Sequence, residues 1–371
     1  MKDKLETYKK RNIILATGGS GGHIIPAKTI AHELIKQGYK PIIVAGENYE
    51  RYIDDNINYK IIRTGKSLRK IKDIFNFVAG TCQTLIYFLL KRPILVIGFG
   101  SYSSAPSMIA AVLLRKKIII QEQNPVMGRV NHFFSRFASV IMTAYCEMYN
   151  VRYKDMNKIS YVGNPIRGSI QKLYNLKYQY PNSDDFNILI TGGSGGSNFF
   201  SNKLIYSFKH LDLKIRNKLK ITQQCRKEDV EFVKDFYQEM GIKNEINTFF
   251  IDMADKLKSA HLVICRSGAM TANECTIAGK PSIMFPYPHA AYNEQFIIAK
   301  ELERGKCAKV IEEKEFNNLD FAKILEELIQ NQNILTEMSD NARKLAKQDA
   351  NKNIIQLIER NITTSIQDKI V

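Results

Sequence analysis

Short apolar runs alternate with amphipathic stretches along the whole chain. Apolar runs bounded by turn residues predict buried strands, and a spacing of three to four residues between apolar positions predicts helices. In the first half, strand-like runs lie at 12–17, 40–45, 94–98, 117–121 and 139–143. Helical patterns between them lie at 26–37, 103–115 and 127–137.

The second half of the chain repeats this alternation. Its strand-like runs lie at 187–191, 219–222, 261–265 and 282–285. Its helical patterns lie at 198–210, 227–240, 269–278 and 291–304, with a charged helix at about 332–361. Strands alternating with helices of this length predict an α/β fold of two domains, each with a parallel, doubly wound sheet.

The boundary between the domains is predicted at the Gly-Asn-Pro turn of 163–165. It follows a strand at 159–162 and precedes a polar segment at 175–185. This divides the chain into a first domain, 1–164, and a second domain, 165–347. The helix at about 348–371 is expected to pack back on the first domain.

Two glycine-rich loops follow the first strand of each half. The first reads GGSGGH at 18–23 and the second reads GGSGGS at 192–197, with helices expected to start near Pro26 and Asn198. Glycine lets an anion approach the backbone, and a helix N-terminus offers free N–H groups. Ligands of such sheets bind at the carboxyl ends of the strands. The repeat therefore predicts a phosphate-bearing ligand between two similar domains.

A third turn of small residues, CRSGAMTANE at 265–274, joins another strand to a helix. Its N–H groups are placed to hold a second phosphate. Glu274 lies one turn into that helix, where a carboxylate could accept hydrogen bonds from both hydroxyls of a ribose. The alternative is an exposed helix glutamate without a ligand.

A basic and then apolar segment runs from Lys66 to Arg92. Its basic residues are Lys66, Arg69, Lys70 and Lys72. One apolar stripe contains Phe75, Val78, Ala79, Cys82, Ile86 and Leu89, and another contains Ile74, Phe77, Leu85 and Phe88. A transmembrane helix is disfavoured by the short run and its polar residues. The open alternatives are a helix buried against the sheet and a membrane-contacting helix, with the second stripe as the contact surface.

Composition narrows the classes of function. The net charge is +17, from 54 basic and 37 acidic residues, but the charge is dispersed along the helices, and no nucleic-acid-binding motif accompanies it. The six cysteines form no C-x-x-C pair, which favours reduced thiols over a disulfide framework or a zinc site. The chain also lacks a Walker lysine, a G-x-G-x-x-G fingerprint and a D-x-D triplet. No metal or cofactor is therefore expected, and helix N-termini and arginines are expected to neutralise a leaving group.

Five motifs together resemble the MurG family, which transfers N-acetylglucosamine to lipid-linked muramyl-pentapeptide in bacterial peptidoglycan synthesis. They are GGSGGH at 18–23, QEQN at 121–124, GNPIR at 163–167, GGS at 192–194 and RSGA at 266–269. The resemblance covers about 12–347. It implies a GT-B architecture of two Rossmann-like domains with the active site in the cleft between them, and an inverting, metal-independent hexosyltransferase.

The resemblance also implies the roles of particular residues. Arg167, Ser194, the backbone of Ile251 and Gln295 would bind UDP-N-acetylglucosamine. The diphosphate and ribose would be held by Ala269, Met270, Thr271, Ala272, Asn273 and Glu274. From the first domain, Ser20, Gly21, Gly22 and Asn124 would complete the site. The chain departs from the family pattern at Ser101, Gly195 and Ser197, and the change at Gly195 puts one donor contact in doubt.

The acceptor hydroxyl needs a base near neutral pH, which suits a histidine. His23 follows the first glycine loop and is the expected base, with a helix-capping role as the alternative and Glu122 as a rival base. The implied partners are the lipid-linked acceptor, an anionic membrane surface and cell-wall synthesis proteins, with no nucleic acid. The implied location is the cytoplasmic face of the cell membrane, as a peripheral protein. The alternatives are transfer to another lipid and a non-catalytic scaffold that binds a UDP-sugar.

Overall fold

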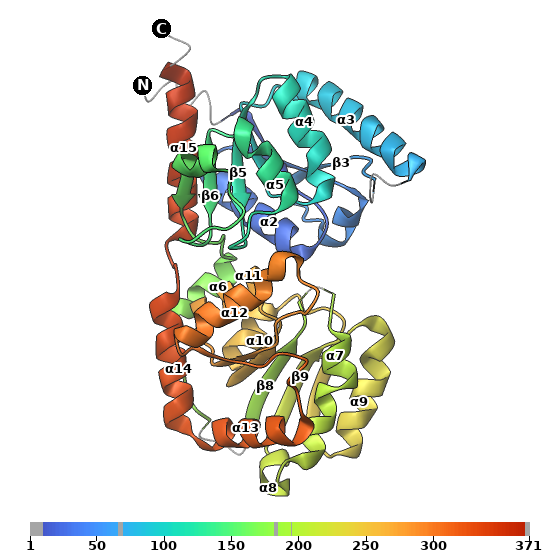
Figure 1. Cartoon of the computed structure of the whole chain (residues 1–371), viewed down its shortest axis with the longest axis vertical. Helices are drawn as coiled ribbons and strands as arrows, with labels where there is room; N and C mark the ends of the chain where they lie inside the picture. The colour runs from blue at the N-terminus through green and yellow to red at the C-terminus, as the bar shows by residue number, and fades with distance from the viewer. Residues whose placement is uncertain (1–9, 66–69, 182–184, 194, 368–371) are drawn as a thin grey trace. The chain divides into compact units, whose positions relative to one another are not determined.

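The computed structural model describes residues 10–65, 70–181, 185–193 and 195–367. Two compact units make up the chain. Unit 1 comprises Met1–Ile166 with Asp349–Val371, and unit 2 comprises Arg167–Gln348 (Figure 1). The sequence had placed the corresponding boundaries after residues 164 and 347.

Unit 1 is built on a parallel sheet of seven strands in the order β3-β2-β1-β4-β5-β6-β7. The strands are β1 Asn12–Ala16, β2 Lys40–Ala45, β3 Asn58–Ile61, β4 Leu95–Gly98, β5 Lys117–Glu122, β6 Val140–Thr143 and β7 Ile159–Tyr161. The helices are α2 Gly21–Lys36, α3 Ile71–Lys91, α4 Ala105–Leu113, α5 Arg129–Phe134 and α15 Ala350–Gln367. Short 3-10 helices are η1 Glu47–Tyr52, η2 Tyr102–Ser104, η3 Ser135–Phe137 and η4 Tyr153–Lys158.

The side chains of β1 alternate between two apolar clusters, one on each face of the sheet. Ile13 and Leu15 pack with α2 and α15, whereas Ile14 and Ala16 pack with α3, α4 and α5. Successive side chains of a strand point to opposite faces, so a strand buried on both sides reads as a continuous apolar run. The last helix of the chain thus completes the core of unit 1.

Unit 2 has a parallel sheet of six strands in the order β10-β9-β8-β11-β12-β13. The strands are β8 Phe186–Thr191, β9 Leu219–Gln224, β10 Lys243–Asn247, β11 Leu262–Cys265, β12 Ser282–Met284 and β13 Ala308–Val310. The helices are α6 Gly168–Gln171, α7 Asn198–Asn202, α8 Leu213–Arg216, α9 Val230–Glu239, α10 Met253–Ser259, α11 Ala269–Ile277, α12 Glu294–Arg304, α13 Asn318–Gln330 and α14 Gln332–Leu345. Its 3-10 helices are η5 Lys172–Asn175, η6 Leu204–His210, η7 Lys227–Asp229 and η8 Ala291–Asn293.

The predicted fold class, two doubly wound α/β domains, is confirmed, but three local predictions change. The first helix begins at Gly21 and not near Pro26, which lies inside α2, so the glycine loop itself forms the first turn. The expected helix at 332–361 is two helices, α14 and α15, which belong to different units. The strands β3, β10 and β13 were not predicted, because the first two are mostly polar edge strands and the third is only three residues long.

The predicted membrane-contacting surface of Ile74, Phe77, Leu85 and Phe88 is only partly exposed in the structure. Helix α3 turns Gly80, Thr84 and Phe88 inward, and a Cβ at Gly80 would lie 1.9 Å from the carbonyl oxygen of Arg63. This close approach decides which face is buried. Phe77 and Leu85 pack half-buried against the core and Phe88 is fully buried, so only Ile74 of that stripe is exposed.

The other apolar stripe of α3 faces outward. Helix α4 lies alongside α3 (Figure 1). The exposed apolar residues of the stripe include Phe75, Val78, Ile86 and Leu89, and Ile71 and Leu90 at the two ends of the helix are exposed as well. Within the described residues, α3 is the one helix long and apolar enough to span a membrane by length and composition, with mean hydropathy 1.3 and 17% of that window buried. An exposed apolar face of this size is unusual for a soluble domain.

Candidate active site

The first glycine loop packs tightly against the loop that follows β4. Gly19 has a φ of +85°, and a Cβ there would lie 2.6 Å from the Ser101 Oγ. The first backbone bonds of α2 run from the N–H groups of His23 and Ile24 to the Ser20 carbonyl. The N–H groups of Gly21 and Gly22 precede these bonds, as at any helix N-terminus. The predicted residues Ser20, Gly21 and Gly22 therefore form the first turn of a helix, whose free N–H groups are of the kind that bind anions.

His23 is held in one orientation by the segments that follow β4 and β5. Its Nδ1 lies 2.8 Å from the backbone oxygen of Phe99 and 3.2 Å from the side-chain oxygen of Gln123. A carbonyl oxygen can only accept, so Nδ1 carries the proton and, in the neutral ring, Nε2 keeps its lone pair. These bonds use Nδ1 as a donor and not as an acceptor of helix N–H groups, which argues against the helix-capping alternative.

Glu122 is a buried carboxylate surrounded by donors. It accepts hydrogen bonds from the backbone of Asn124 at 3.2 Å, the backbone of Gly128 at 3.0 Å and the side chain of Asn131 at 2.9 Å. Burial raises the pKa of Glu122 above its ordinary value, and these bonds oppose the rise. The side chain is 1% exposed. Glu122 therefore positions the segment that carries Asn124, and its burial stands against the role of rival base.

In unit 2, the second glycine loop is tied to the rest of the domain through Ser197. Ser194 lies outside the described residues. Arg266 donates a hydrogen bond to the Ser197 Oγ at 3.0 Å and forms an ion pair with Glu313 at 2.5 Å. The serine at 197, a departure from the family pattern, thus supplies an acceptor to a buried arginine. Gly195 is described and a Cβ there would meet nothing within 4 Å.

Arg167 and Glu274 meet, although they are 107 positions apart in the chain. The Arg167 Nε and Nη2 donate to the same carboxylate oxygen of Glu274, Oε1, at 3.0 and 2.7 Å. Glu274 is 8% exposed. Burial raises its pKa, and the charge of Arg167 opposes the rise. Two residues predicted to bind the donor, one just before α6 and one within α11, are therefore joined by an ion pair.

The N-terminus of α11 carries free donors of the kind that bind phosphate. Its first backbone bond runs from Ala272 to Gly268, so the N–H groups of Ala269, Met270 and Thr271 precede it. The Asn273 Nδ2 is buried, and it has no hydrogen-bond partner in the described part of the chain. The turn therefore offers backbone donors and one unused side-chain donor together.

Gln295 lies beside this helix start. Its backbone oxygen accepts from the Ser267 hydroxyl at 2.8 Å, and its side-chain oxygen accepts from the Tyr287 N–H at 3.0 Å. The side-chain amide nitrogen is thereby left as the donor. Tyr292 and Asn293, just before α12, both have a φ near +55°, a conformation that non-glycine residues rarely adopt. Such strain at the start of a helix is typical of functional sites.

Ile251, whose backbone was predicted to contact the donor, lies on the turn between β10 and α10. It is 91% exposed, so its backbone is accessible.

Three residues that orient predicted site residues were not predicted from the sequence. Ser267 and Tyr287 orient Gln295, and Gln123 orients His23. The turn-forming Pro-Tyr-Pro sequence at 286–288, two residues after the end of β12, was a signal for Tyr287. Lys70 and Lys72 are exposed at the start of α3, whereas Lys66 and Arg69 lie outside the described residues.

Two family models match the chain, one in each half. Residues 13–143 match the glycosyltransferase family 28 N-terminal domain, and residues 187–354 match the glycosyltransferase family 28 C-terminal domain. The matches confirm that each half is one glycosyltransferase domain.

Relatives match along nearly the whole chain. A UDP-N-acetylglucosamine--N-acetylmuramyl-(pentapeptide) pyrophosphoryl-undecaprenol N-acetylglucosamine transferase of Zymomonas mobilis is 34% identical, covering 94% of this chain and 92% of the relative. A transferase of the same name from Wolbachia pipientis is 36% identical, covering 90% of this chain and 94% of the relative. The crystal structure of Acinetobacter baumannii MurG superposes with a TM-score of 0.74 at 27% identity, covering 94% and 99% of the two chains. The chain is therefore a member of glycosyltransferase family 28 with the GT-B architecture, and within it of the MurG family.

Proposed function

We propose that this chain transfers N-acetylglucosamine from UDP-N-acetylglucosamine to the C4 hydroxyl of undecaprenyl-pyrophosphoryl-N-acetylmuramyl-pentapeptide. The observation that carries the proposal is its similarity, over 90 to 94% of its length, to transferases named for this reaction. Peptidoglycan synthesis is the process it serves. Transfer to another lipid and a non-catalytic scaffold are not favoured by these relatives.

Unit 2 is proposed to hold the donor. The N–H groups at the start of α11 would face the diphosphate, and the charge that develops on the leaving UDP would be stabilised there. The Glu274 Oε1 is engaged by Arg167, so Oε2 is proposed to accept the ribose hydroxyls. The amide nitrogen of Gln295 would donate to the sugar, and the exposed backbone of Ile251 would contact the uracil.

Unit 1 is proposed to supply the base. The acceptor hydroxyl oxygen attacks the anomeric carbon, the bond from that carbon to the UDP oxygen breaks, and the hydroxyl proton passes to Nε2 of His23. The Phe99 carbonyl supports this step because it fixes Nδ1–H and stabilises the imidazolium that forms. Asn124, whose backbone is held by Glu122, would lie beside the transferred sugar, and the turn at Ser20 to Gly22 would complete the site.

Unit 1 is also proposed to contact the membrane, through the outward face of α3. The polyprenyl tail of the acceptor cannot leave the bilayer, so the acceptor-binding unit must reach it. Apolar side chains on this face would insert between lipids, and Lys70 and Lys72 at its start would contact anionic headgroups. The protein would be a peripheral protein on the cytoplasmic side of the cell membrane.

Release of UDP from UDP-N-acetylglucosamine, measured with and without the lipid-linked acceptor, tests the reaction. Acceptor-dependent release with a glycosylated lipid product is expected. If UDP were released only with a different lipid acceptor, that lipid would be the substrate in place of the proposed one. If the donor bound but no UDP were released, the chain would be a non-catalytic scaffold.

Co-sedimentation with vesicles tests the membrane surface. The variant Phe75→Asn with Leu89→Asn removes two exposed apolar side chains of α3, and the control Phe232→Asn changes an exposed aromatic residue of unit 2. The first variant is expected to lose the salt-insensitive part of vesicle binding, and the control is expected to retain it. Equal binding by both variants would place the membrane surface elsewhere.

A further inference from the structure

Two buried amide side chains of the sequence motifs have no part in the proposed reaction so far. Gln123 belongs to the QEQN motif at 121–124, and Asn164 belongs to the GNPIR motif at 163–167. Burying an amide is costly unless its groups find hydrogen-bond partners, so an apolar residue would serve packing alone better. The partners of the two amides therefore indicate what each amide does.

The Gln123 side chain joins His23 to the end of β5. Its Nε2 donates to the backbone oxygen of Gln121 at 3.2 Å, and its Oε1 lies 3.2 Å from the Nδ1 of His23. A backbone oxygen can only accept a hydrogen bond, so the amide nitrogen must face Gln121 and the amide oxygen must face His23. The orientation of the Gln123 amide is therefore fixed by the protein itself.

The Nδ1 of His23 thus meets two acceptors, the Gln123 Oε1 and the Phe99 backbone oxygen at 2.8 Å. In the other tautomer of the neutral ring, the lone pair of Nδ1 would face both oxygens and neither hydrogen bond would form. Only the tautomer with the proton on Nδ1 leaves Nε2 free to take up a proton. A backbone oxygen is present whatever residue stands at position 99, whereas the second acceptor depends on the glutamine at position 123.

Asn164 holds the backbone from which the Gln123 side chain projects. Its Nδ2 donates to the backbone oxygen of Gln123 at 3.1 Å, although the two residues are 41 positions apart. The segment that carries Asn164 is itself anchored two residues further on. There the Asn351 side chain, at the start of α15, bonds both backbone groups of Ile166, at 2.8 and 2.7 Å. A continuous line of buried hydrogen bonds therefore runs from this segment to His23, all of it within unit 1.

We propose that Gln123 and Asn164 are positioning residues for His23. Asn164 holds the backbone of Gln123, and the Gln123 amide holds His23 in the tautomer whose Nε2 accepts the proton of the acceptor hydroxyl. The inference deepens the proposed function and rests on the role of His23 as base. It also gives the Gly-Asn-Pro turn at 163–165 a part in the reaction, at a distance from the reacting atoms.

The tautomer of His23 is measured by nitrogen NMR on the full chain labelled with nitrogen-15 histidine, with the ring neutral. The spectrum of His23→Ala assigns the signal among the six histidines. Gln123→Met keeps a side chain of similar length without the amide, and Asn164→Ala removes the donor to the Gln123 backbone. Loss of one neutral hydrogen bond corresponds to a factor of about 2 to 10, so Gln123→Met should lower the ratio of the Nδ1–H to the Nε2–H tautomer by that factor. Asn164→Ala is expected to shift the ratio in the same direction.

Transfer kinetics provide the second measurement. Both variants are expected to lower kcat by a similar factor and to leave the KM for UDP-N-acetylglucosamine near wild type, because the donor is proposed to bind unit 2. The two variants act at separate positions, so one that fails to fold leaves the other as the test, and denaturant unfolding shows which is folded.

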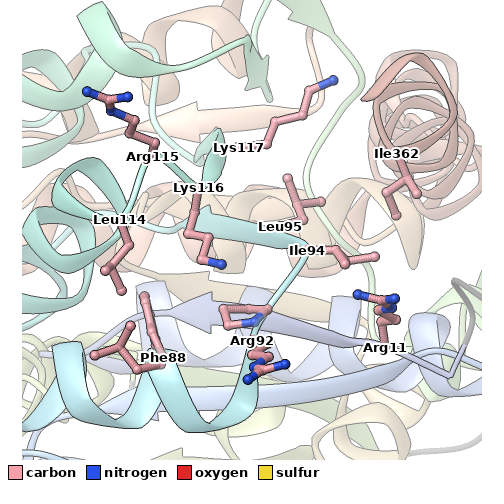
Figure 2. A pocket seen from close by; sticks show the side chains of 12 residues that line it. Arg11, Phe88, Arg92, Ile94, Leu95, Leu114, Arg115, Lys116, Lys117 and Ile362 are labelled. Carbon is pink, nitrogen blue, oxygen red and sulfur yellow. The ribbon is translucent and has the colours of Figure 1, made fainter. Parts of the chain in front are cut away.

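The control Asn361→Ala removes another amide that links two segments of unit 1. The Asn361 Oδ1 accepts from the Ser139 hydroxyl at 3.2 Å, and its Nδ2 donates to the Leu357 oxygen at 3.0 Å. The backbone oxygen of Asn361 accepts from Lys117, the first residue of β5, so this link lies at the opposite end of the strand from Gln123. Figure 2 shows Lys117 and Ile362 at this end of the sheet, among the residues that line a cavity. The control is expected to keep the wild-type tautomer and the wild-type kcat.

Three results decide the proposal. A wild-type tautomer ratio in folded Gln123→Met would overturn it, and so would a lower kcat with an unchanged tautomer, because both amides would then only stabilise the fold. An equal shift of the tautomer in the control would overturn it as well. If the tautomer shifts as expected but His23→Ala retains near-normal turnover, the positioning of His23 is supported and its role as base fails. The NMR measurement needs no transfer reaction, so failure of this proposal is distinguishable from failure of the proposed function.

Discussion

In the proposed donor site, the two carboxylate oxygens of Glu274 have different partners. The Nε and Nη2 of Arg167 donate to Oε1, at 3.0 and 2.7 Å, and Oε2 remains as the candidate acceptor for a ribose hydroxyl. In Glu274→Gln the amide oxygen can still accept from Arg167, but a donor replaces Oε2 and the negative charge is lost. A hydrogen bond to a charged group contributes about 1.5–3 kcal/mol, so UDP affinity should fall about 10- to 150-fold.

The ligand itself provides the decisive comparison. If Glu274 binds the 2′-hydroxyl, the wild type should bind 2′-deoxy-UDP more weakly than UDP, and Glu274→Gln should discriminate much less between the two. Calorimetry with both nucleotides on both proteins gives this coupling directly. The control Glu245→Gln makes the same chemical change in a carboxylate of unit 2 that pairs with Lys256, at 2.8 and 2.9 Å, and UDP affinity should be unchanged.

Two results would refute the reasoning. One is wild-type UDP affinity in a folded Glu274→Gln protein. The other is an equal loss of affinity for UDP and 2′-deoxy-UDP, which would mean that Glu274 only positions Arg167. The side chain of Arg167 is 28% exposed, so weakening the pair should cost only about 1–2 kcal/mol of stability, below the range for a fully buried pair. Denaturant unfolding separates that effect from the loss of ligand binding.

Three further predictions concern single side chains. His23→Ala should lower the transfer rate by about 10²–10⁴ and leave UDP affinity near wild type, whereas near-normal turnover at saturating substrates would make the residue structural. Ser101 has a φ of +70° and a ψ of 147°, a region almost restricted to glycine, so Ser101→Gly should raise the free energy of unfolding by about 1 kcal/mol in urea titrations; a loss of stability would contradict the strain. Burial, with the charge of Lys280, lowers the pKa of His261 to about 4, and its Nδ1 accepts the Asn187 N–H at 2.8 Å. The folded pKa lies below the unfolded value of about 6.5, so stability is fully present above pH ~6.5 and falls as the pH drops toward 4. The shift corresponds to about 3 kcal/mol, and because the ring is only partly buried we expect a loss of about 2 kcal/mol. His261→Gln should flatten that slope, and an unchanged slope would assign it to other groups.

The hydrophobic pattern alone determined much of this protein. Strands buried on both faces, such as β1 and β8, read as continuous apolar runs, and each passes into a glycine-rich turn that has few alternatives. The order of five short motifs was enough to identify the family, which the matches of both halves confirmed. These features are local, because a buried parallel strand and a glycine turn each leave their signature within about ten residues.

Only the tertiary structure decided the features that depend on distant partners. The edge strands β3 and β10 are mostly polar and exist because β2 and β9 offer them backbone hydrogen bonds. Helix α3 is apolar nearly all round, so its own sequence does not tell which face is buried; the close passage of Gly80 against Arg63 decides it. The burial of Glu122 likewise results from donors that other segments supply. Local patterns record what a segment prefers, whereas contacts between distant segments are settled only when the chain packs.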